Sequence, residues 1–150
     1  MTVFYRDTKQ INVKELVKLY SFSNWAKFRS PQEAEEILEH SSLVMSAWEG
    51  IHLVGFARVL TDFIFRAAIY DVIVHPDFQH QGLGSGLITK LLTHRSLSRV
   101  EVFHLLTKIN RKFYEKVGFV KSDQEGYASM TWVRKTSPVP NIVDADRPSS

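Results

Sequence analysis

The stretch that decides the fold is "HPDFQHQGLGSG", residues 75–86, in which Gly82, Gly84 and Gly86 alternate with other residues. An apolar run typical of a strand, "AAIYDVIV", precedes it, and apolar residues at helical spacing follow it. Glycines in such a loop allow a ligand to approach the backbone closely. Because the first turn of a helix has unpaired N–H groups and a partial positive charge, we expect an anionic group to bind here.

Two common phosphate-binding loops do not fit this stretch. A P-loop ends in Gly-Lys-Ser/Thr, and "GLGSGLITK" lacks that ending. A dinucleotide-binding fingerprint has Gly-x-Gly-x-x-Gly directly after a strand, with an acid such as Glu101 about 20 residues further on. Here the spacing is Gly-x-Gly-x-Gly, and "HPDFQHQ" with its Pro76 separates the strand from the first glycine. That separation is too long for the tight first turn of a dinucleotide fold.

Outside this stretch, hydrophobic periodicity and turn residues predict an alternation of strands and helices. Ser30, Pro31 and Glu33 form a capping box at a helix start, and Glu49-Gly50 is a good hairpin turn. The resulting order predicts an α/β (α+β) fold with a mixed sheet flanked by helices. We expect strands over 2–6, 42–49, 51–60, 65–74, 98–106 and 126–135, and helices over 12–20, 30–40, from 82 onward and over 109–119.

Composition predicts one ordinary globular domain over 1–136, followed by a flexible tail over 137–150 that is rich in Pro, Ser and Asp. The chain has no cysteine, so disulfides and thiolate metal sites are excluded, and its histidines lack metal-ligand spacing. No apolar run approaches the roughly 18 residues of a membrane span, and the start lacks the core of a signal peptide. We therefore expect a cytoplasmic protein without a membrane partner. The net charge of +3, without a Lys/Arg stripe, predicts no nucleic-acid partner.

Two sequence blocks carry a family resemblance. "QHQGLG", residues 79–84, resembles the Gln/Arg-x-x-Gly-x-Gly/Ala signature of the GNAT (Gcn5-related N-acetyltransferase) superfamily. "NRKFYEKVGF", residues 110–119, is similar to that family's Asn, Phe-Tyr and Gly-Phe block. The resemblance follows the order of the elements from about residue 3 to 133. Within the family, the stretch "AR…TD…F…AAIYDVIV" together with "QHQGLG" is similar to the bacterial and plastid branch related to serotonin N-acetyltransferases.

The resemblance implies a mostly antiparallel sheet whose fourth and fifth strands splay apart. It also implies acetyl-CoA as the acetyl donor and a primary amine as the acceptor. The pantetheine arm would pair with the backbone of Ile73 and Val74, and Asn110 would be either a helix cap or a further partner of that arm. The remaining residues expected to bind the donor are Gln79 and Phe113, with the N–H groups of Gln81, Gly82, Leu83, Gly84 and Ser85 around the pyrophosphate.

Two residues are candidates for the chemistry. Tyr114 is either an amphipathic core residue or, as the resemblance implies, the general acid that returns a proton to the CoA thiolate. Asp71 lies in an apolar strand, where a carboxylate is costly unless paired or solvated. It either forms an ion pair with Arg58 or Arg66, or contacts the amine directly or through a water. Many relatives have an acid at the position of Tyr70, so this chain favours a water relay or an amine that arrives deprotonated.

The acceptor side is expected at the loops over 21–30 and around 58–68. Trp25, Phe28 and Tyr70 would line a pocket for an apolar or aromatic amine, with Asp62 meeting the ammonium, or they are edge residues of the core. The sequence therefore favours an N-acetyltransferase that acts on a small-molecule amine by direct attack. A protein or peptide N-acetyltransferase and a non-catalytic acyl-CoA sensor are the alternatives. A homodimer is compatible with the sequence and is kept as an expectation.

Overall fold

The structure is a computed structural model that describes residues 2–107, 110–126 and 129–130. The chain divides into two compact units, Met1–Gly118 and Phe119–Ser150. The second unit contains one described element, a 3-10 turn over Ser122–Glu125. The expected last strand, 126–135, falls for the most part outside the described residues, and the expected tail, 137–150, does so entirely. A domain boundary at residue 136 therefore stays a prediction.

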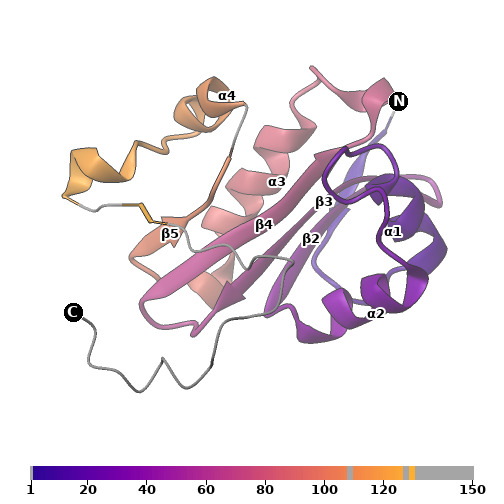
Figure 1. The fold of residues 1–150 in the computed structure, drawn as a ribbon, viewed down its shortest axis with the longest axis horizontal. Helices are drawn as coiled ribbons and strands as arrows, with labels where there is room; N and C mark the ends of the chain where they lie inside the picture. Colours follow the sequence, from indigo (N-terminus) through magenta and orange to yellow (C-terminus); the bar gives the residue numbers. More distant parts are fainter. Residues whose placement is uncertain (1, 108–109, 127–128, 131–150) are drawn as a thin grey trace, which may run out of the picture. The chain divides into compact units, whose positions relative to one another are not determined.

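The first unit is built on a five-stranded sheet whose strands follow the order of the chain (Figure 1). Neighbours from β1 to β4 pair antiparallel, and β4 pairs parallel with β5. The mixed, mostly antiparallel sheet that the sequence predicts is thereby confirmed. The strands are β1 (Phe4–Arg6), β2 (Leu43–Glu49), β3 (His52–Thr61), β4 (Arg66–Val74) and β5 (Val102–His104).

Local sequence signals set the helix ends. The Asn12 side chain accepts a hydrogen bond from the Lys14 N–H at 2.9 Å, and Ser30 and Glu33 form the predicted capping box. Strand β5, Val102–His104, is shorter than the predicted strand over 98–106, because the N–H groups of Ser98 and Val100 donate to Arg95 and Leu97 in the 3-10 turn that precedes it. The helices are α1 (Val13–Tyr20), α2 (Pro31–His40), α3 (Leu83–Leu92) and α4 (Arg111–Lys116), and a further 3-10 turn spans Pro76–Phe78.

Helices cover both faces of the sheet. On one face, α1 and α2 enclose a core in which Leu16, Leu19 and Tyr20 pack with Phe56 and Val44. On the other face, α3 contributes the fully buried side chains of Leu87, Ile88 and Leu91. A Cβ built at Gly55 of β3 would lie 3.1 Å from Leu87, so a glycine here allows α3 to approach the sheet closely. Each buried aliphatic side chain contributes about 1.5–3 kcal/mol, which fixes α3 on the sheet.

Gly86 serves this packing rather than the loop. A Cβ at this position would overlap the hydroxyl and ring of Tyr5, which β1 places over α3. Alanine ordinarily stabilises a helix interior by about 1 kcal/mol relative to glycine. At Gly86 the overlap is with a ring anchored in a strand, and relieving it costs about 1–3 kcal/mol. The cost of the overlap with Tyr5 therefore outweighs the gain in helix propensity that alanine would bring.

We accordingly predict that Gly86→Ala lowers the free energy of unfolding by about 1–2 kcal/mol in urea denaturation. The matched control is the same substitution in a Tyr5→Leu background, where the ring is absent. There Gly86→Ala should be neutral or stabilising, because only the helix propensity remains. An equal loss of stability in both backgrounds would show that Tyr5 is not the cause.

Candidate active site

Strands β4 and β5 separate within a few residues. They pair from Arg66–Val102 to Ala68–His104, but β4 continues to Val74. In the described part of the chain, no strand pairs with this edge of β4 beyond Ala68. The splayed strands expected from the sequence are confirmed. Because unpaired backbone groups of a strand can pair with an extended ligand, an extended molecule can bind along this edge.

The hydrogen-bond pattern shows which backbone groups face the open edge. The His75 N–H donates to the Val54 carbonyl at 2.8 Å, so the backbone groups of His75 point toward β3. Since these groups alternate along a strand, those of Ile73 also point toward β3 and those of Val74 point to the open edge. Of the two positions predicted to pair with the donor, the geometry favours Val74. Its carbonyl accepts the Gln79 side-chain N–H at 3.1 Å.

The glycine turn leads directly from this edge into α3. His80 and Gly82 both have positive φ, +63° and +84°, and a Cβ at Gly82 would meet no atom within 4 Å. The first helical hydrogen bond runs from the Gly86 N–H to the Gly82 carbonyl at 2.9 Å. The N–H groups of Leu83, Gly84 and Ser85 precede that bond and lie in the first turn, where a helix has no acceptors for them. The turn thus combines open space with N–H donors, which suits a pyrophosphate.

The two glutamines of the signature support the loop from within. The Gln79 side chain donates to the Val74 carbonyl, and the Gln81 side chain donates to the Asp77 carbonyl at 3.3 Å. Their amide groups therefore hold the loop's own backbone. Because the Gln81 side chain is used within the loop, only its backbone N–H group is left for the predicted contact with the pyrophosphate.

Helix α4 brings Tyr114 toward the glycine turn. A Cβ at Gly84 would lie 2.9 Å from the Phe113 ring, so Phe113 packs directly on the first turn of α3. The Phe113 and Tyr114 rings then meet edge to face, with centroids 4.9 Å apart. Asn110 starts α4 in a left-handed conformation and accepts the Phe113 N–H at 2.9 Å through its carbonyl, while its side chain makes no capping bond. Partial burial raises the pKa of Tyr114, so this phenol keeps its proton at neutral pH.

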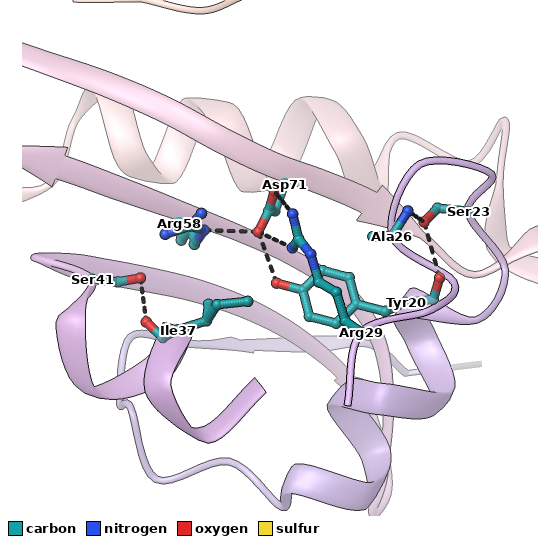
Figure 2. Close-up of polar contacts among 8 residues, drawn as sticks. All are labelled: Tyr20, Ser23, Ala26, Arg29, Ile37, Ser41, Arg58 and Asp71. Carbon is teal, nitrogen blue, oxygen red and sulfur yellow. Dashed lines mark hydrogen bonds and ion pairs between the residues drawn. The ribbon is translucent and has the colours of Figure 1, made fainter. Parts of the chain in front are cut away.

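Asp71 is the centre of a second cluster, on the face of the sheet that α1 and α2 cover (Figure 2). Its Oδ2 accepts hydrogen bonds from Arg29 at 2.6 Å, Arg58 at 2.7 Å and the Tyr20 hydroxyl at 2.8 Å. Arg29 reaches the second carboxylate oxygen at 3.4 Å. The four side chains come from α1, the loop after it, β3 and β4. We call these four residues the Asp71 cluster.

A bulge in β4 places Asp71 in the cluster. Phe56 pairs with Ile73 and Arg58 pairs with Tyr70, so two residues of β4 stand opposite Ala57. Asp71 takes up the extra residue with a φ of +57°. The bulge shifts the alternation of side chains, so Asp71 lies on the same face as Arg58, the cross-strand partner of Tyr70.

The environment keeps Asp71 ionised. Burial by itself would raise the pKa of its carboxyl, but the hydrogen bond from Arg29 and the charges of both arginines outweigh burial and lower that pKa. Burial and the adjacent carboxylate raise the pKa of Tyr20, which therefore stays neutral. A carboxylate held by three donors is a weak base. The geometry thus favours the ion-pair alternative for Asp71, with the predicted partner Arg58 and a second partner, Arg29, that the sequence did not indicate.

The predicted acceptor residues divide into two groups. Trp25 and Tyr70 lie on the cluster, with Trp25 stacked on Arg29 at 5.4 Å and Tyr70 on Arg58 at 5.5 Å. Phe28 is 86% exposed and lies against Lys27. Asp62 accepts the backbone N–H groups of residues 64–66, and these bonds lower the pKa of its carboxyl. Oδ1 of this carboxylate is bound by its own loop, so the structure gives Asp62 a turn-forming role. The contact with an ammonium stays a prediction.

Among the residues described, no group of three or more His, Asp or Glu side chains is placed to hold a metal ion. In the same residues, no helix is long and apolar enough to cross a membrane.

The comparisons with known proteins agree with this geometry. The sequence profile of the acetyltransferase (GNAT) domain matches residues 8–134. The chain is 36% identical over 135 residues to the protein named uncharacterized N-acetyltransferase ycf52 of Porphyra purpurea. The aligned residues cover 87% of this chain and 76% of the relative. It is 40% identical over 83 residues to histone acetyltransferase TAP1 of Glycine max, covering 53% of this chain and 32% of that protein.

The fold has close counterparts among solved structures. A GNAT-family acetyltransferase from Streptococcus pneumoniae TIGR4 superimposes with a TM-score of 0.74 at 24% identity, covering 89% of this chain and 99% of that one. At this level of identity the likeness concerns the fold alone. It agrees with a sheet flanked by helices on both faces.

We predict that Asp71→Asn lowers the free energy of unfolding at pH 7 by about 3 kcal/mol, because it leaves two partly buried arginines without a counter-charge. The folded-state pKa of Asp71 lies below its unfolded value. The contribution of Asp71 to the free energy of unfolding is therefore complete above its pKa in the unfolded chain. It is lost as the pH falls through its pKa in the folded protein. Urea denaturation of both proteins between pH 7 and pH 2 should show the gap in stability closing at the acid end.

The matched control is Tyr20→Phe, which removes one hydrogen-bond donor and leaves both arginines paired with Asp71. It should cost about 1 kcal/mol, with much less dependence on pH. A pH-independent gap for Asp71→Asn would contradict the ion-pair role.

Proposed function

The chain belongs to the GNAT family of acetyl-CoA-dependent acetyltransferases, and on that basis we propose that it acetylates the primary amine of a small molecule by direct attack. The observation that carries the proposal is the separation of β4 from β5 after Ala68, beside a glycine turn with open space at Gly82. An extended arm and a diphosphate need these two features side by side. The hydrogen bond from Gln79 to Val74 ties the turn to the strand edge.

The donor's binding residues follow from the geometry. Backbone groups on the open edge of β4, with Val74 foremost, would pair with the amides of the pantetheine arm. The N–H groups from Gly82 to Ser85 would hold the diphosphate, since they are not used within α3. Asn110 has a side chain that makes no capping bond, which supports a contact with the arm.

The transfer needs one new bond, one broken bond and two proton movements. The neutral amine attacks the thioester carbonyl, a C–N bond forms, the C–S bond breaks, and the thiolate takes up a proton. Acetyl-CoA supplies the activated acyl group and the leaving thiol. Tyr114 would donate the proton to the leaving thiolate, and its raised pKa keeps that proton available at neutral pH.

No carboxylate acts as the base that removes the proton of the amine in this proposal. Tyr70 stands where many relatives have an acid, and Asp71 is held by Arg29 and Arg58. Two arginines and one carboxylate leave the Asp71 cluster with a net positive charge. Such a charge disfavours an ammonium and favours the neutral amine, so the proton can leave to water before the attack.

A protein or peptide acceptor is the second candidate. It is favoured by the name of the Glycine max relative and by the exposure of Trp25 and Phe28, 57% and 86%. A screen for acetyl-CoA-dependent thiol release over small amines and lysine peptides distinguishes the two. A higher kcat/KM for peptides would overturn the small-molecule acceptor, and no release with any amine would favour an acyl-CoA sensor. The cytoplasm as location and a homodimer as assembly stay proposals from the sequence.

We predict that Gly82→Asn weakens CoA binding at least tenfold with little change in melting temperature. Asparagine tolerates a positive φ, but its side chain would fill the space where the diphosphate is expected. Isothermal titration calorimetry with CoA measures the affinity. Gly50→Asn is the matched control, because Gly50 also has a positive φ, +58°, and no atom within 4 Å of a built Cβ. Wild-type affinity in folded Gly82→Asn would remove the diphosphate from this turn.

We further predict that Tyr114→Phe lowers kcat by about 10²–10⁴-fold, the usual contribution of a general acid, and leaves the affinity for CoA nearly unchanged. The substitution keeps the ring that meets Phe113, so folding should be preserved. Steady-state kinetics with a saturating amine measures the loss. If turnover stays within about twofold of wild type, the role of Tyr114 is packing alone.

A further inference from the structure

We propose that the acceptor amine also carries an anionic group, a carboxylate or a phosphate, and that Arg58 binds it. This inference rests on the proposed function and adds the chemical class of the acceptor. It makes Arg58 a specificity-determining residue beside the point where the acetyl group would be transferred.

The charge of the Asp71 cluster is the first argument. Two guanidinium groups face one carboxylate, and the third partner, Tyr20, is neutral. Outside the cluster, the exposed Glu33 accepts the Ser30 N–H at 2.9 Å, and its charge acts on Arg29. The four residues of the cluster themselves carry one net positive charge at a half-buried place, where a bound anion is screened less by solvent than at the surface.

The two arginines differ in what they can still bind. Arg29 uses both terminal nitrogens on Asp71 and lies between the rings of Tyr20 and Trp25, at 4.7 and 5.4 Å. Arg58 binds Asp71 through Nε alone, at 2.7 Å. Its two terminal nitrogens make no hydrogen bond to another described residue, and its side chain is 18% exposed. A guanidinium with both terminal nitrogens available can hold a carboxylate or phosphate by two parallel hydrogen bonds.

The position of Arg58 connects this anion site to the reaction. Arg58 pairs directly with Tyr70, which follows the last β4–β5 pair by two residues. The Tyr70 ring covers the guanidinium face and is 40% exposed, so the site has an apolar wall next to its charge. A molecule with an amine at one end and an anion at the other would then be oriented with its amine toward the open edge of β4.

The chemistry of this site differs from the pocket predicted from the sequence. An acid at Asp62 would have selected a cation, but that carboxylate is bound by its own loop. A net positive site instead selects against amines whose only charge is the ammonium. The same charge promotes deprotonation of the amine that is to attack.

The test compares matched acceptors with the full chain and acetyl-CoA, following thiol release. The carboxylate pair is phenylalanine and phenylalaninamide, and the phosphate pair is tyramine O-phosphate and tyramine. The amide is a stringent control, because its amine is less basic and a larger share of it is neutral. We expect kcat/KM to be at least tenfold higher for the anionic member of one pair, and that pair identifies the anion. Equal or higher kcat/KM for the members without an anionic group, in both pairs, would overturn the proposal.

Arg58→Lys tests the residue. Lysine keeps the charge beside Asp71 but lacks the planar fork. We expect a loss of at least tenfold in kcat/KM for the acceptor with the anionic group and a change within threefold for the matched acceptor without it. Arg6→Lys is the matched control, since Arg6 is a strand arginine stacked on Phe4 and Trp48 at 4.9 and 5.8 Å. A uniform loss for both acceptors in Arg58→Lys would contradict a role in specificity.

A binding measurement separates this inference from the proposed function. Calorimetry with 3-phenylpropionate in the presence of CoA needs no turnover. If 3-phenylpropionate binds the wild type and binds Arg58→Lys at least tenfold more weakly, the anion site is supported. This holds even if no amine is acetylated, and in that case only the proposed function fails. Equal binding of 3-phenylpropionate and 3-phenylpropionamide to the wild type would overturn the anion site while leaving the acetyltransferase activity untouched.

Discussion

The carboxylate of Asp71 is the interaction on which the arrangement of the site depends. It joins α1, the loop after α1, β3 and β4 through Tyr20, Arg29 and Arg58. A buried charge is tolerated only when it is paired and hydrogen-bonded, so these segments must meet at this point in the folded state. The loop that carries Trp25 ends at Arg29 and is thus fixed over the sheet. In this way a single anion in the interior determines where the loop that carries Trp25, the proposed acceptor side, lies on the sheet.

The sequence predicts the parts of the fold that short-range patterns control. The capping box of Ser30 and Glu33 and the glycine stretch before α3 all lie within a few neighbouring residues. The separation of β4 and β5 and the role of Tyr114 came from the family resemblance and not from local patterns. The length of β5 was overestimated because "SRVEVFHLL" alternates polar and apolar residues at its start, as a strand does, and neither Gly nor Pro marks the turn before it.

The parts that were missed depend on contacts between distant residues. Arg29 is 42 residues from Asp71, and no local pattern indicates which of several arginines will reach a given carboxylate. Asp62 looks like a free acid in the sequence, yet its oxygen closes a turn with three backbone N–H groups. The glycines look alike in the stretch 75–86, but Gly82 provides a positive φ, Gly84 admits the Phe113 ring and Gly86 admits Tyr5. Only the packing distinguishes these three reasons.

The bulge in β4 has a consequence for how this strand can vary. With one residue removed at Asp71 or Val72, β4 would pair with β3 in unbroken register, and the ladder itself would lose nothing. Such a deletion would leave Tyr70 and Ile73 on their present faces, because each keeps its partner on β3. The single residue left opposite Ala57 would, however, face away from Arg58, so the strand would no longer bring a carboxylate to Arg29 and Arg58. Single residues of this strand can therefore be substituted one at a time, whereas its length cannot change. Length variation among functional descendants of this chain should be confined to the loops on either side.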